Sequence, residues 1–316
     1  MRAILVVNPK ATTTTGRGRD VLVRALRSEV DLTVAYTRRR GHAVTLARAA
    51  AREGVDLVVT LGGDGTVNEV VNGLMTAGPS GAAGDPPPAE QLPALATVPG
   101  GSTNVFARAL GLPGQWPEAT SVILEGLRLG RYRTIGLGLA DDRYFTFCAG
   151  VGMDAAVINR VERARRRGRV SSPGLYLRAL LNEYFLATDR RHPTISLEQP
   201  GEPVADGLGT VIIQNTAPWT YLGNREINPN PAASFDLGLD VLAFRRLRAP
   251  STARTVGQIL ARRTEPHGEH LLRLHDVAEF TVVSQHPEAF QLDGDYLGER
   301  NKVRFASVPA ALRVIC

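Results

Sequence analysis

The sequence predicts an α/β domain followed by a second domain built mainly of β-strands. In the first third of the chain, short apolar runs alternate with stretches whose apolar residues recur at helical spacing. After about Arg131, many short strand patterns follow one another with few helical segments between them. The 316 residues also suggest about two domains. We expect residues 1–132, joined by the last residues 308–316, to form the α/β domain, and residues 133–307 to form the β-rich domain.

The first domain is predicted to be a parallel sheet covered by helices. Strands alternating with helices are typical of βαβ units. The expected strands are Ala3–Val7, Leu32–Tyr36, Leu57–Leu61 and Leu95–Val98, and the expected helices are Gly18–Val30, His42–Glu53, Val67–Leu74 and Asn104–Leu110. The segment Gly78–Pro93 is rich in Gly, Ala and Pro, which indicates a loop.

The second domain is predicted to be an antiparallel β-sandwich, because many of its strands follow one another without a crossover helix. Helices are expected at Asp154–Arg167, Leu175–Leu186 and Thr252–Arg262, and the segment Ala311–Val314 is expected to return to the first domain. The expected strands are Arg133–Leu139, Tyr144–Cys148, Thr194–Leu197, Gly209–Asn215, Asp240–Phe244, Glu279–Ser284, Ala289–Leu292 and Val303–Ala306.

Composition favours a cytoplasmic globular protein. Hydrophobic residues make up 43% and charged residues 22% of the chain, and the two cysteines cannot form a disulfide framework. No run of about 18 apolar residues predicts a transmembrane helix. The 37 basic residues exceed the 31 acidic ones and are nearly all arginine, which suits phosphate groups and anionic surfaces. We predict no nucleic-acid binding, because the arginines are not accompanied by a helix-turn-helix, RNP or zinc pattern.

The strongest functional signal is a glycine-rich turn between a strand and a helix. The segment Gly62–Thr66 reads GGDGT, and it follows the expected strand Leu57–Leu61. Glycines let the backbone approach a ligand closely, and a helix N-terminus favours phosphate. Asp64 places a carboxylate in that turn, where it could meet Mg²⁺ or cap a helix. The spacing matches neither the dinucleotide fingerprint nor the P-loop.

Two further loops are expected at the same edge of the sheet. Asn8-Pro9 and a Thr- and Gly-rich segment follow the first strand, and Pro99–Asn104 follows the strand Leu95–Val98. In doubly wound sheets, ligands bind beyond the carboxyl ends of the strands. The three loops together therefore predict a phosphate-binding site there.

The sequence resembles the diacylglycerol kinase catalytic domain of bacterial lipid kinases, which belong to a superfamily that includes sphingosine and ceramide kinases. The resemblance spans the chain in order. It rests on Asn8-Pro9, Thr37 with Gly41-His42-Ala43, Gly62–Thr66, Asn68-Glu69 with Asn72-Gly73, Gly101–Pro113, Phe147–Ala155, Asn228–Val241 and Asp293-Gly294-Asp295.

The resemblance implies an N-terminal domain similar to those of NAD kinase and 6-phosphofructokinase, joined to a C-terminal β-sandwich, with ATP and Mg²⁺ as cofactors. The implied ATP-binding residues are Asn8, Pro9, Thr37, Gly62, Gly63, Asp64, Gly65, Thr66, Asn68, Glu69, Gly101, Ser102 and Asn104. Asp295 is the implied proton acceptor, with Asp64 and Asp293 as further catalytic residues. A structural Mg²⁺ is implied at Asp236, with the carbonyls of Ala233 and Gly238.

The sequence departs from the family pattern at four of these places. Asp295 stands where the family usually has Glu, Ser102 replaces Thr, and Val105 stands where Asp is often found. At the implied metal site, the usual Asp-Gly reads Asp236-Leu237-Gly238.

The resulting hypothesis is an ATP-dependent lipid kinase that converts diacylglycerol to phosphatidic acid. We expect it to contact the membrane surface, and a homodimer is one expected assembly. The basic run Arg160–Arg169 is either a contact for anionic lipid or a solvated helix end, and Leu175–Leu186 either covers an acyl chain or belongs to the core. The alternatives are a sphingosine- or ceramide-type kinase, an NAD kinase-like enzyme, and a nucleotide- or lipid-binding regulator without catalysis.

Overall fold

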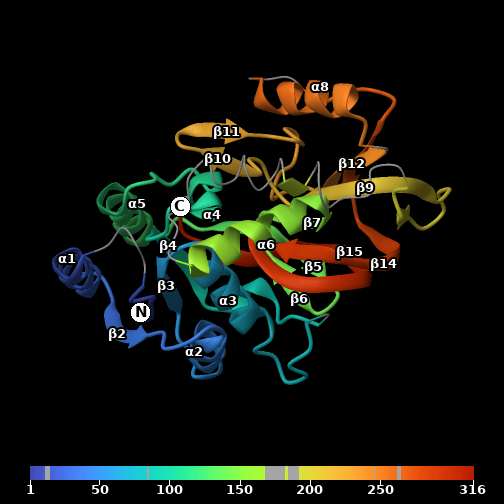
Figure 1. Cartoon of the computed structure of the whole chain (residues 1–316). Helices are drawn as coiled ribbons and strands as arrows, with labels where there is room; N and C mark the ends of the chain where they lie inside the picture. Colours follow the sequence, from blue (N-terminus) through green and yellow to red (C-terminus); the bar gives the residue numbers. More distant parts are fainter. Residues whose placement is uncertain (11–14, 84, 168–181, 184–191, 246, 262–264) are drawn as a thin grey trace. The chain divides into compact units, whose positions relative to one another are not determined.

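The chain folds into two compact units in a computed structural model. The structure describes residues 1–10, 15–83, 85–167, 182–183, 192–245, 247–261 and 265–316 (Figure 1). Unit 1 comprises Met1–Thr146 and Val308–Cys316, and unit 2 comprises Phe147–Ser307. The expected helix Leu175–Leu186 lies, apart from residues 182 and 183, outside the described residues.

Unit 1 extends beyond residue 132, where the sequence places the end of the first domain. It also contains the antiparallel hairpin of β5 (Arg133–Ala140) and β6 (Arg143–Phe145). Two buried amide side chains of α3 (Asp64–Met75) hold this hairpin: Asn68 and Asn72 both donate to the Tyr144 carbonyl, at 3.0 and 2.9 Å.

The sheet of unit 1 is parallel, as predicted. Its strand order is β2-β1-β3-β4, followed by the last residues of β15. The strands are β1 (Arg2–Val7), β2 (Asp31–Tyr36), β3 (Leu57–Gly62), β4 (Ala94–Pro99) and β15 (Asp295–Val314). Every residue of β3 and β4 is buried, as expected for parallel strands covered on both faces. Val314 pairs with Leu95, which confirms the expected return of the C-terminus.

Helices cover both faces of this sheet (Figure 1). Helix α1 (Gly16–Arg27) contacts α5 (Trp116–Leu129), whereas α2 (His42–Arg52) packs against α3. This division follows from the strand order, because right-handed crossovers that run in opposite directions place their helices on opposite faces. Two short helices, α4 (Val105–Ala109) and the 3₁₀ helix Ala89–Gln91, complete the unit. The sequence analysis did not predict α5.

Unit 2 is an antiparallel sheet, as predicted, in the order β13-β12-β9-β7-β14-β15. Strand β8 pairs with β9 and β14 beyond the residues that β7 pairs with, so β7 and β8 share one place in the sheet. The strands are β7 (Cys148–Gly152), β8 (Ile195–Glu198), β9 (Ala205–Gln214), β12 (Leu239–Arg245), β13 (Leu271–Val277) and β14 (Glu279–Leu292). The two strands expected over Glu279–Leu292 form the single strand β14.

In the described parts of unit 2, the longer helices are α6 (Met153–Arg166) and α8 (Ala249–Leu260). A separate hairpin joins β10 (Thr220–Leu222) to β11 (Arg225–Ile227). Part of the core is a buried apolar cluster of Met153, Ile212, Leu242, Phe244 and Leu247. The chain passes from β7 into α6 through Gly152, whose φ of 85° lies in the region that favours glycine. This turn fixes the start of α6 next to β7.

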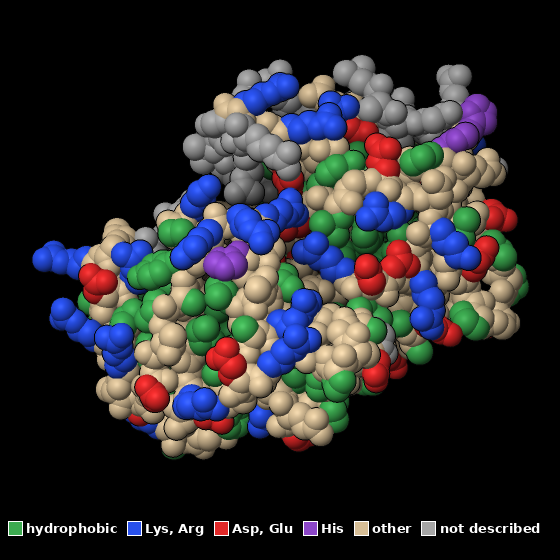
Figure 2. Space-filling view, turned by 90° about the horizontal axis from the view of Figure 1, so that it is seen from below, with side chains coloured by type: hydrophobic (Ala, Val, Ile, Leu, Met, Phe, Trp, Pro, Cys, Tyr) green, Lys and Arg blue, Asp and Glu red, His purple; other side chains and the backbone are tan. Residues whose placement is uncertain are grey.

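The basic charge is not confined to one patch. Figure 2 shows Lys and Arg side chains spread across the face that it draws. Among the described helices, none combines the length and the hydrophobicity that a membrane span needs.

Candidate functional site

In unit 1, the loops singled out by the sequence come together at the carboxyl ends of the parallel strands. Backbone hydrogen bonds connect each loop to its neighbour. The Thr37 amide donates to the Val7 carbonyl at 2.8 Å, and the Asn8 amide donates to the Leu61 carbonyl at 3.0 Å. The Gly100 amide donates to the Gly62 carbonyl at 2.8 Å. The ends of β1, β2, β3 and β4 therefore form one continuous edge.

Two glycine backbones touch at this edge. A Cβ atom added to Gly101 would lie 2.7 Å from the Cα of Gly63, closer than real Cβ contacts come. A Cβ atom at Gly62 would lie 2.5 Å from the Thr66 hydroxyl. Gly63, the N-cap residue of α3, has no side chain and so leaves the start of that helix open to a close approach. This cradle of bare backbone at a helix N-terminus suits phosphate.

The Asp64 carboxylate connects the two glycine loops. Its Oδ2 accepts a hydrogen bond from the Val105 amide at 3.1 Å, and its Oδ1 accepts one from the Phe106 amide at 3.0 Å. These are the first amides of α4, whose own N-cap residue, Asn104, provides no side-chain cap. Asp64 therefore caps a helix of a different loop, and the positive end of the α4 dipole stabilises its charge.

Asn104 shapes the second glycine loop. Its side chain accepts from the Gly101 amide at 2.8 Å and donates to the Gly101 carbonyl at 2.9 Å. Asn104 itself adopts the left-handed conformation, with φ of 52°. Ser102 lies exposed between these residues. Asn104 thus fixes the loop through its bonds to Gly101. Ser102 is exposed, so its side chain is accessible to a ligand.

Two other predicted ATP-binding residues hold the scaffold. Glu69 accepts from the amides of Gly41 and Ala43, at 2.7 and 3.1 Å, and so caps α2. Asn68 is only 1% exposed, and its Oδ1 accepts from the Arg143 guanidinium at 2.7 Å. In this structure both side chains position neighbouring segments.

The first loop is also held from within. Asn8 donates to the Thr66 hydroxyl at 3.3 Å and accepts from the Lys10 amide at 3.0 Å, while Pro9 is exposed. Gly65 is half-buried in the first turn of α3. Asn8 and Thr66 thus join the ends of β1 and β3.

In unit 2, the predicted catalytic motif forms a two-residue hairpin turn between β14 and β15. Asp293 and Gly294 both have positive φ, 49° and 79°, and Leu292 pairs with Asp295. Asp293 is buried, and its Oδ1 accepts from the amides of Phe147 and Cys148 at 3.0 and 3.2 Å. Asp293 therefore anchors the turn, and Asp295 follows it as a half-buried residue at the start of β15.

Next to this turn lies a carboxyl group that the sequence analysis did not single out. Asp154, in the first turn of α6, retains some exposed surface, but protein atoms surround its carboxyl group. This desolvation raises its pKa to about 6, although a hydrogen bond from Gln291 at 3.0 Å lowers it in part. A Cβ atom at Gly150 would overlap the Asp154 carboxylate. The motif Phe147–Ala155 contains both Gly150 and Asp154, and a glycine four residues before an aspartate is the sequence signal that could have indicated this site.

The three residues implied for a structural Mg²⁺ lie between β11 and β12. Asp236 is exposed, and the Ala233 carbonyl accepts a hydrogen bond from the Ala217 amide at 3.0 Å. The Gly238 amide donates to Asp276 at 2.6 Å. In the described parts of the chain, no three His, Cys, Asp or Glu side chains cluster as metal ligands.

A charged pair lies beside these residues. The buried Asp240 contacts His275 Nδ1 at 2.9 Å, and this partner raises the pKa of His275. The Asp240 carboxylate therefore favours the protonated form of His275.

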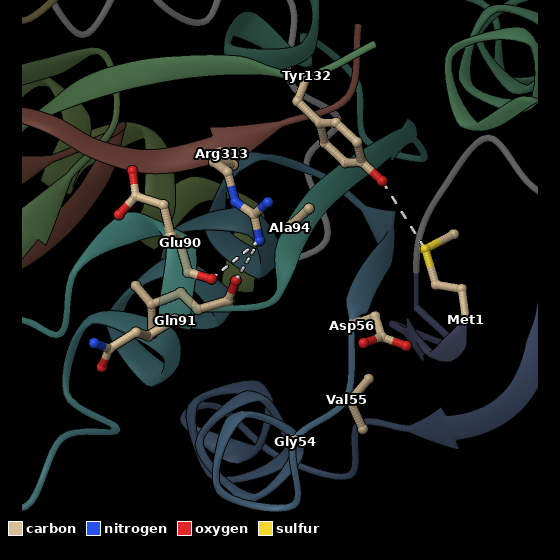
Figure 3. Close-up of a pocket in the computed structure, with 10 residues that line it drawn as sticks. Met1, Gly54, Val55, Asp56, Glu90, Gln91, Ala94, Tyr132 and Arg313 are labelled. Carbon is tan, nitrogen blue, oxygen red and sulfur yellow. Dashed lines mark hydrogen bonds between the residues drawn. The ribbon is translucent and has the colours of Figure 1, made fainter. Parts of the chain in front are cut away.

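Unit 1 also has a pocket of about 490 Å³ at the opposite, amino-terminal end of its sheet (Figure 3). Arg313 there donates to the backbone carbonyls of Ala89, Glu90 and Leu92, and its guanidinium lies over the Tyr132 ring. None of the predicted site residues lines this pocket. Ligands of open α/β sheets bind at the carboxyl ends of the strands. The candidate site is therefore the edge formed by the ends of β1, β2, β3 and β4 with Gly62, Gly63 and Gly101, called the glycine edge below.

Comparison with known proteins agrees with this placement. Residues 2–135 match the model of the diacylglycerol kinase catalytic domain. The N-terminal part of the chain is therefore similar to this family. The matched residues include the whole glycine edge, from Asn8 to Asn104. The predicted family resemblance is therefore confirmed.

Among curated relatives, the chain is 38% identical over 141 residues to "Probable lipid kinase YegS-like" of Chromohalobacter salexigens, covering 45% of this chain and 41% of that protein. It is 38% identical over 113 residues to the diacylglycerol kinase of Bacillus subtilis, covering 35% of this chain and 32% of that one. The chain thus matches less than half the length of these relatives.

Solved structures show the fold over the whole chain. A crystal structure of a diacylglycerol kinase from Bacillus anthracis is similar with a TM-score of 0.71 at 19% identity, and 99% of this chain and 96% of that chain are covered. An NAD kinase from Archaeoglobus fulgidus, crystallised with ATP, is similar with a TM-score of 0.52 at 10% identity, covering 100% and 94%. The predicted α/β fold with an antiparallel second region is confirmed.

Proposed function

We propose that the chain is an ATP-dependent lipid kinase that transfers the γ-phosphoryl group of ATP to the hydroxyl of diacylglycerol, giving phosphatidic acid. The match of residues 2–135 to the diacylglycerol kinase catalytic-domain model supports the reaction class. The observation that carries the proposal is the bare backbone of Gly62, Gly63 and Gly101 at the N-terminus of α3. This arrangement suits the phosphates of a nucleotide.

In this proposal, unit 1 binds and orients the nucleotide. The positive end of the α3 dipole attracts the phosphate oxygens, and the exposed Ser102 provides a hydroxyl donor. Asp64 and Asn104 keep the glycine loops in place through backbone hydrogen bonds. A Mg²⁺ ion bound with the nucleotide would supply positive charge that stabilises the phosphates.

Unit 2 provides the proposed proton acceptor, Asp295. As the lipid oxygen forms its bond to the γ-phosphorus, the bond between that phosphorus and the β–γ bridging oxygen breaks. The electron pair leaves with ADP, and the lipid hydroxyl proton goes to the Asp295 carboxylate. A base of this kind contributes about 10²–10⁴-fold to the rate.

The test is incubation of the purified protein with labelled ATP, Mg²⁺ and mixed micelles of diacylglycerol, sphingosine or ceramide, with NAD in a separate tube. Label in phosphatidic acid would support the proposal. Label in another lipid would keep the kinase and change its substrate, and label in NADP would overturn the lipid assignment. Binding of ATP without transfer to any acceptor would favour a regulator.

We also propose that the protein works in the cytoplasm and visits an anionic membrane surface through the basic end of α6. Arg163 and Arg167 are exposed there, whereas Arg160 pairs with Glu183. Each arginine near such a surface contributes about 1 kcal/mol. Charge reversal of Arg163 and Arg167 should weaken binding to vesicles containing phosphatidylserine but not to neutral vesicles. Unchanged binding to the anionic vesicles would exclude this surface.

A further inference from the structure

The buried pair of Asp154 and Gln291 lies beside the turn that carries Asp295, and the proposed reaction does not use it. From its geometry, we infer that Gln291 and Asp154 are positioning residues, which fix the Asp293-Gly294 turn and through it the Asp295 carboxylate. The catalytic part of this inference rests on the proposed role of Asp295. The structural part, the anchoring of the turn, does not.

The amide of Gln291 connects the turn to α6. Gln291 is 1% exposed, its Nε2 donates to Asp154 Oδ2 at 3.0 Å, and its Oε1 accepts from the Gly294 amide at 2.9 Å. Only one orientation of the amide serves both partners, because a carboxylate accepts and a backbone N–H donates. The side chain is therefore fixed at both ends.

The residue on the other side of Asp295 is held in the same way. The Tyr296 amide donates to Glu162, which also belongs to α6, at 3.2 Å. Asp295 thus lies between two residues whose backbone amides are both anchored to α6, one through Gln291 and one directly. Asp293 adds a third anchor by accepting from the amides of Phe147 and Cys148.

Anchoring matters more for an aspartate than for a longer acid. A general base must lie within hydrogen-bond reach of the proton that it accepts, and an error of about 1 Å can cost about 10²-fold in rate. Asp295 has one side-chain torsion fewer than glutamate with which to correct such an error. The backbone of the turn must therefore set the position of its carboxylate.

The experiment compares variants that remove the anchor with variants that keep it. Gln291→Met removes both hydrogen bonds at similar volume. Asp154→Ala removes the partner, whereas Asp154→Asn keeps an oxygen that can accept from Gln291. Thr255→Val is the matched control, because it removes a partly buried hydrogen bond at 2.7 Å, between α8 and His270, away from the turn in the sequence.

We expect Gln291→Met to lower kcat at least about 10-fold with the KM for ATP unchanged, and Asp154→Asn to recover most of the kcat that Asp154→Ala loses. Thr255→Val should lower the melting temperature but not kcat. Adding Gln291→Met to Asp295→Asn should lower kcat little further than Asp295→Asn alone does, because both changes act through one carboxylate. A wild-type kcat in Gln291→Met, or a fully additive double variant, would overturn the inference.

Amide hydrogen exchange tests the anchoring without any activity. The peptide containing Gly294 and Tyr296 should exchange faster in Gln291→Met than in the wild type and in Thr255→Val. Unchanged exchange would overturn the anchoring. If the wild type transferred no phosphate to any lipid, the proposed function would fail, and exchange would still decide whether Gln291 anchors the turn.

Discussion

Replacing Asp64 separates a structural role from a chemical one at the glycine edge. Its carboxylate accepts two backbone hydrogen bonds at 3.1 and 3.0 Å from the first amides of α4. Hydrogen bonds to charged groups contribute about 1.5–3 kcal/mol each, and loss of a helix cap costs about 0.5–2 kcal/mol. Because the site is only partly buried, we expect Asp64→Ala to lower the free energy of unfolding by about 2–4 kcal/mol. Asp64→Asn keeps one accepting oxygen, so about 1–2 kcal/mol is expected.

The assay is thermal unfolding measured beside ATP binding and turnover. In a unit of this size, about 1 kcal/mol corresponds to roughly 2–4 °C in melting temperature. Asp64→Ala should therefore unfold several degrees below the wild type and bind ATP weakly, because the two glycine loops lose their connection. Asp64→Asn should lose at least as much turnover as Asp295→Asn. The exposed Asp20 of α1 provides the control Asp20→Asn, which should change neither quantity. An Asp64→Ala variant with wild-type stability and no turnover would refute the structural role of Asp64 in connecting the two glycine loops. It would favour a direct chemical role.

Three further predictions follow from the same geometry. Asp295→Asn should lower kcat by about 10²–10⁴-fold while calorimetry shows ATP affinity close to that of the wild type, and near-normal turnover would exclude Asp295 as the base. Gly101→Ala should force the two glycine loops apart, because its Cβ would lie 2.7 Å from the Cα of Gly63, and we expect a loss of about 1–3 kcal/mol in urea unfolding together with weaker ATP binding. The pKa of His275 is raised above 6.5, chiefly by its hydrogen bond to Asp240, so the folded state binds this proton more tightly than the unfolded state. The stabilisation from this pair is complete below pH 6.5 and is lost as the pH rises through the pKa of His275 in the folded state. Urea titrations should show this decline in the wild type and not in His275→Gln. Identical pH profiles of the two proteins would contradict this prediction.

The sheet of unit 1 could be predicted because its evidence is local. The apolar runs of β1, β3 and β4 and the glycines that follow them are visible in the sequence, and the strands lie within one or two residues of their expected bounds. Helix α3 begins at Asp64, three residues before the expected start, because its first turn reads Asp-Gly-Thr and carries none of the apolar residues that marked the helix. Helix α5 was missed although Pro117 in its first turn and Gly130 at its C-cap, with φ of 60°, are ordinary end signals.

The second unit was harder to predict, because antiparallel pairing depends on contacts between distant segments. The apolar pattern of β14 is interrupted between Ser284 and Ala289, and the strand continues across the interruption with a shift in register against β15. The turn after β14 uses an Asp-Gly pair, which is typical of two-residue hairpins, and Asp293 and Gly294 both have positive φ. The anchoring of that turn to α6 was not visible, since it depends on a buried glutamine 137 residues away from Asp154.

The polar residues of the glycine edge show why a motif does not by itself separate chemistry from architecture. Asp64, Glu69 and Asn68 form hydrogen bonds with backbone groups 26 to 76 residues away, which no local pattern records. A phosphate cradle made of bare glycine backbone has no apolar side chains to hold it together. Hydrogen bonds from a few carboxylates and amides must supply that cohesion, so the side chains that stabilise the cradle belong to the same short motifs as those that would touch a ligand. Loss of turnover after a substitution in such a motif therefore identifies a catalytic group only when the loops that it holds are shown to have stayed in place.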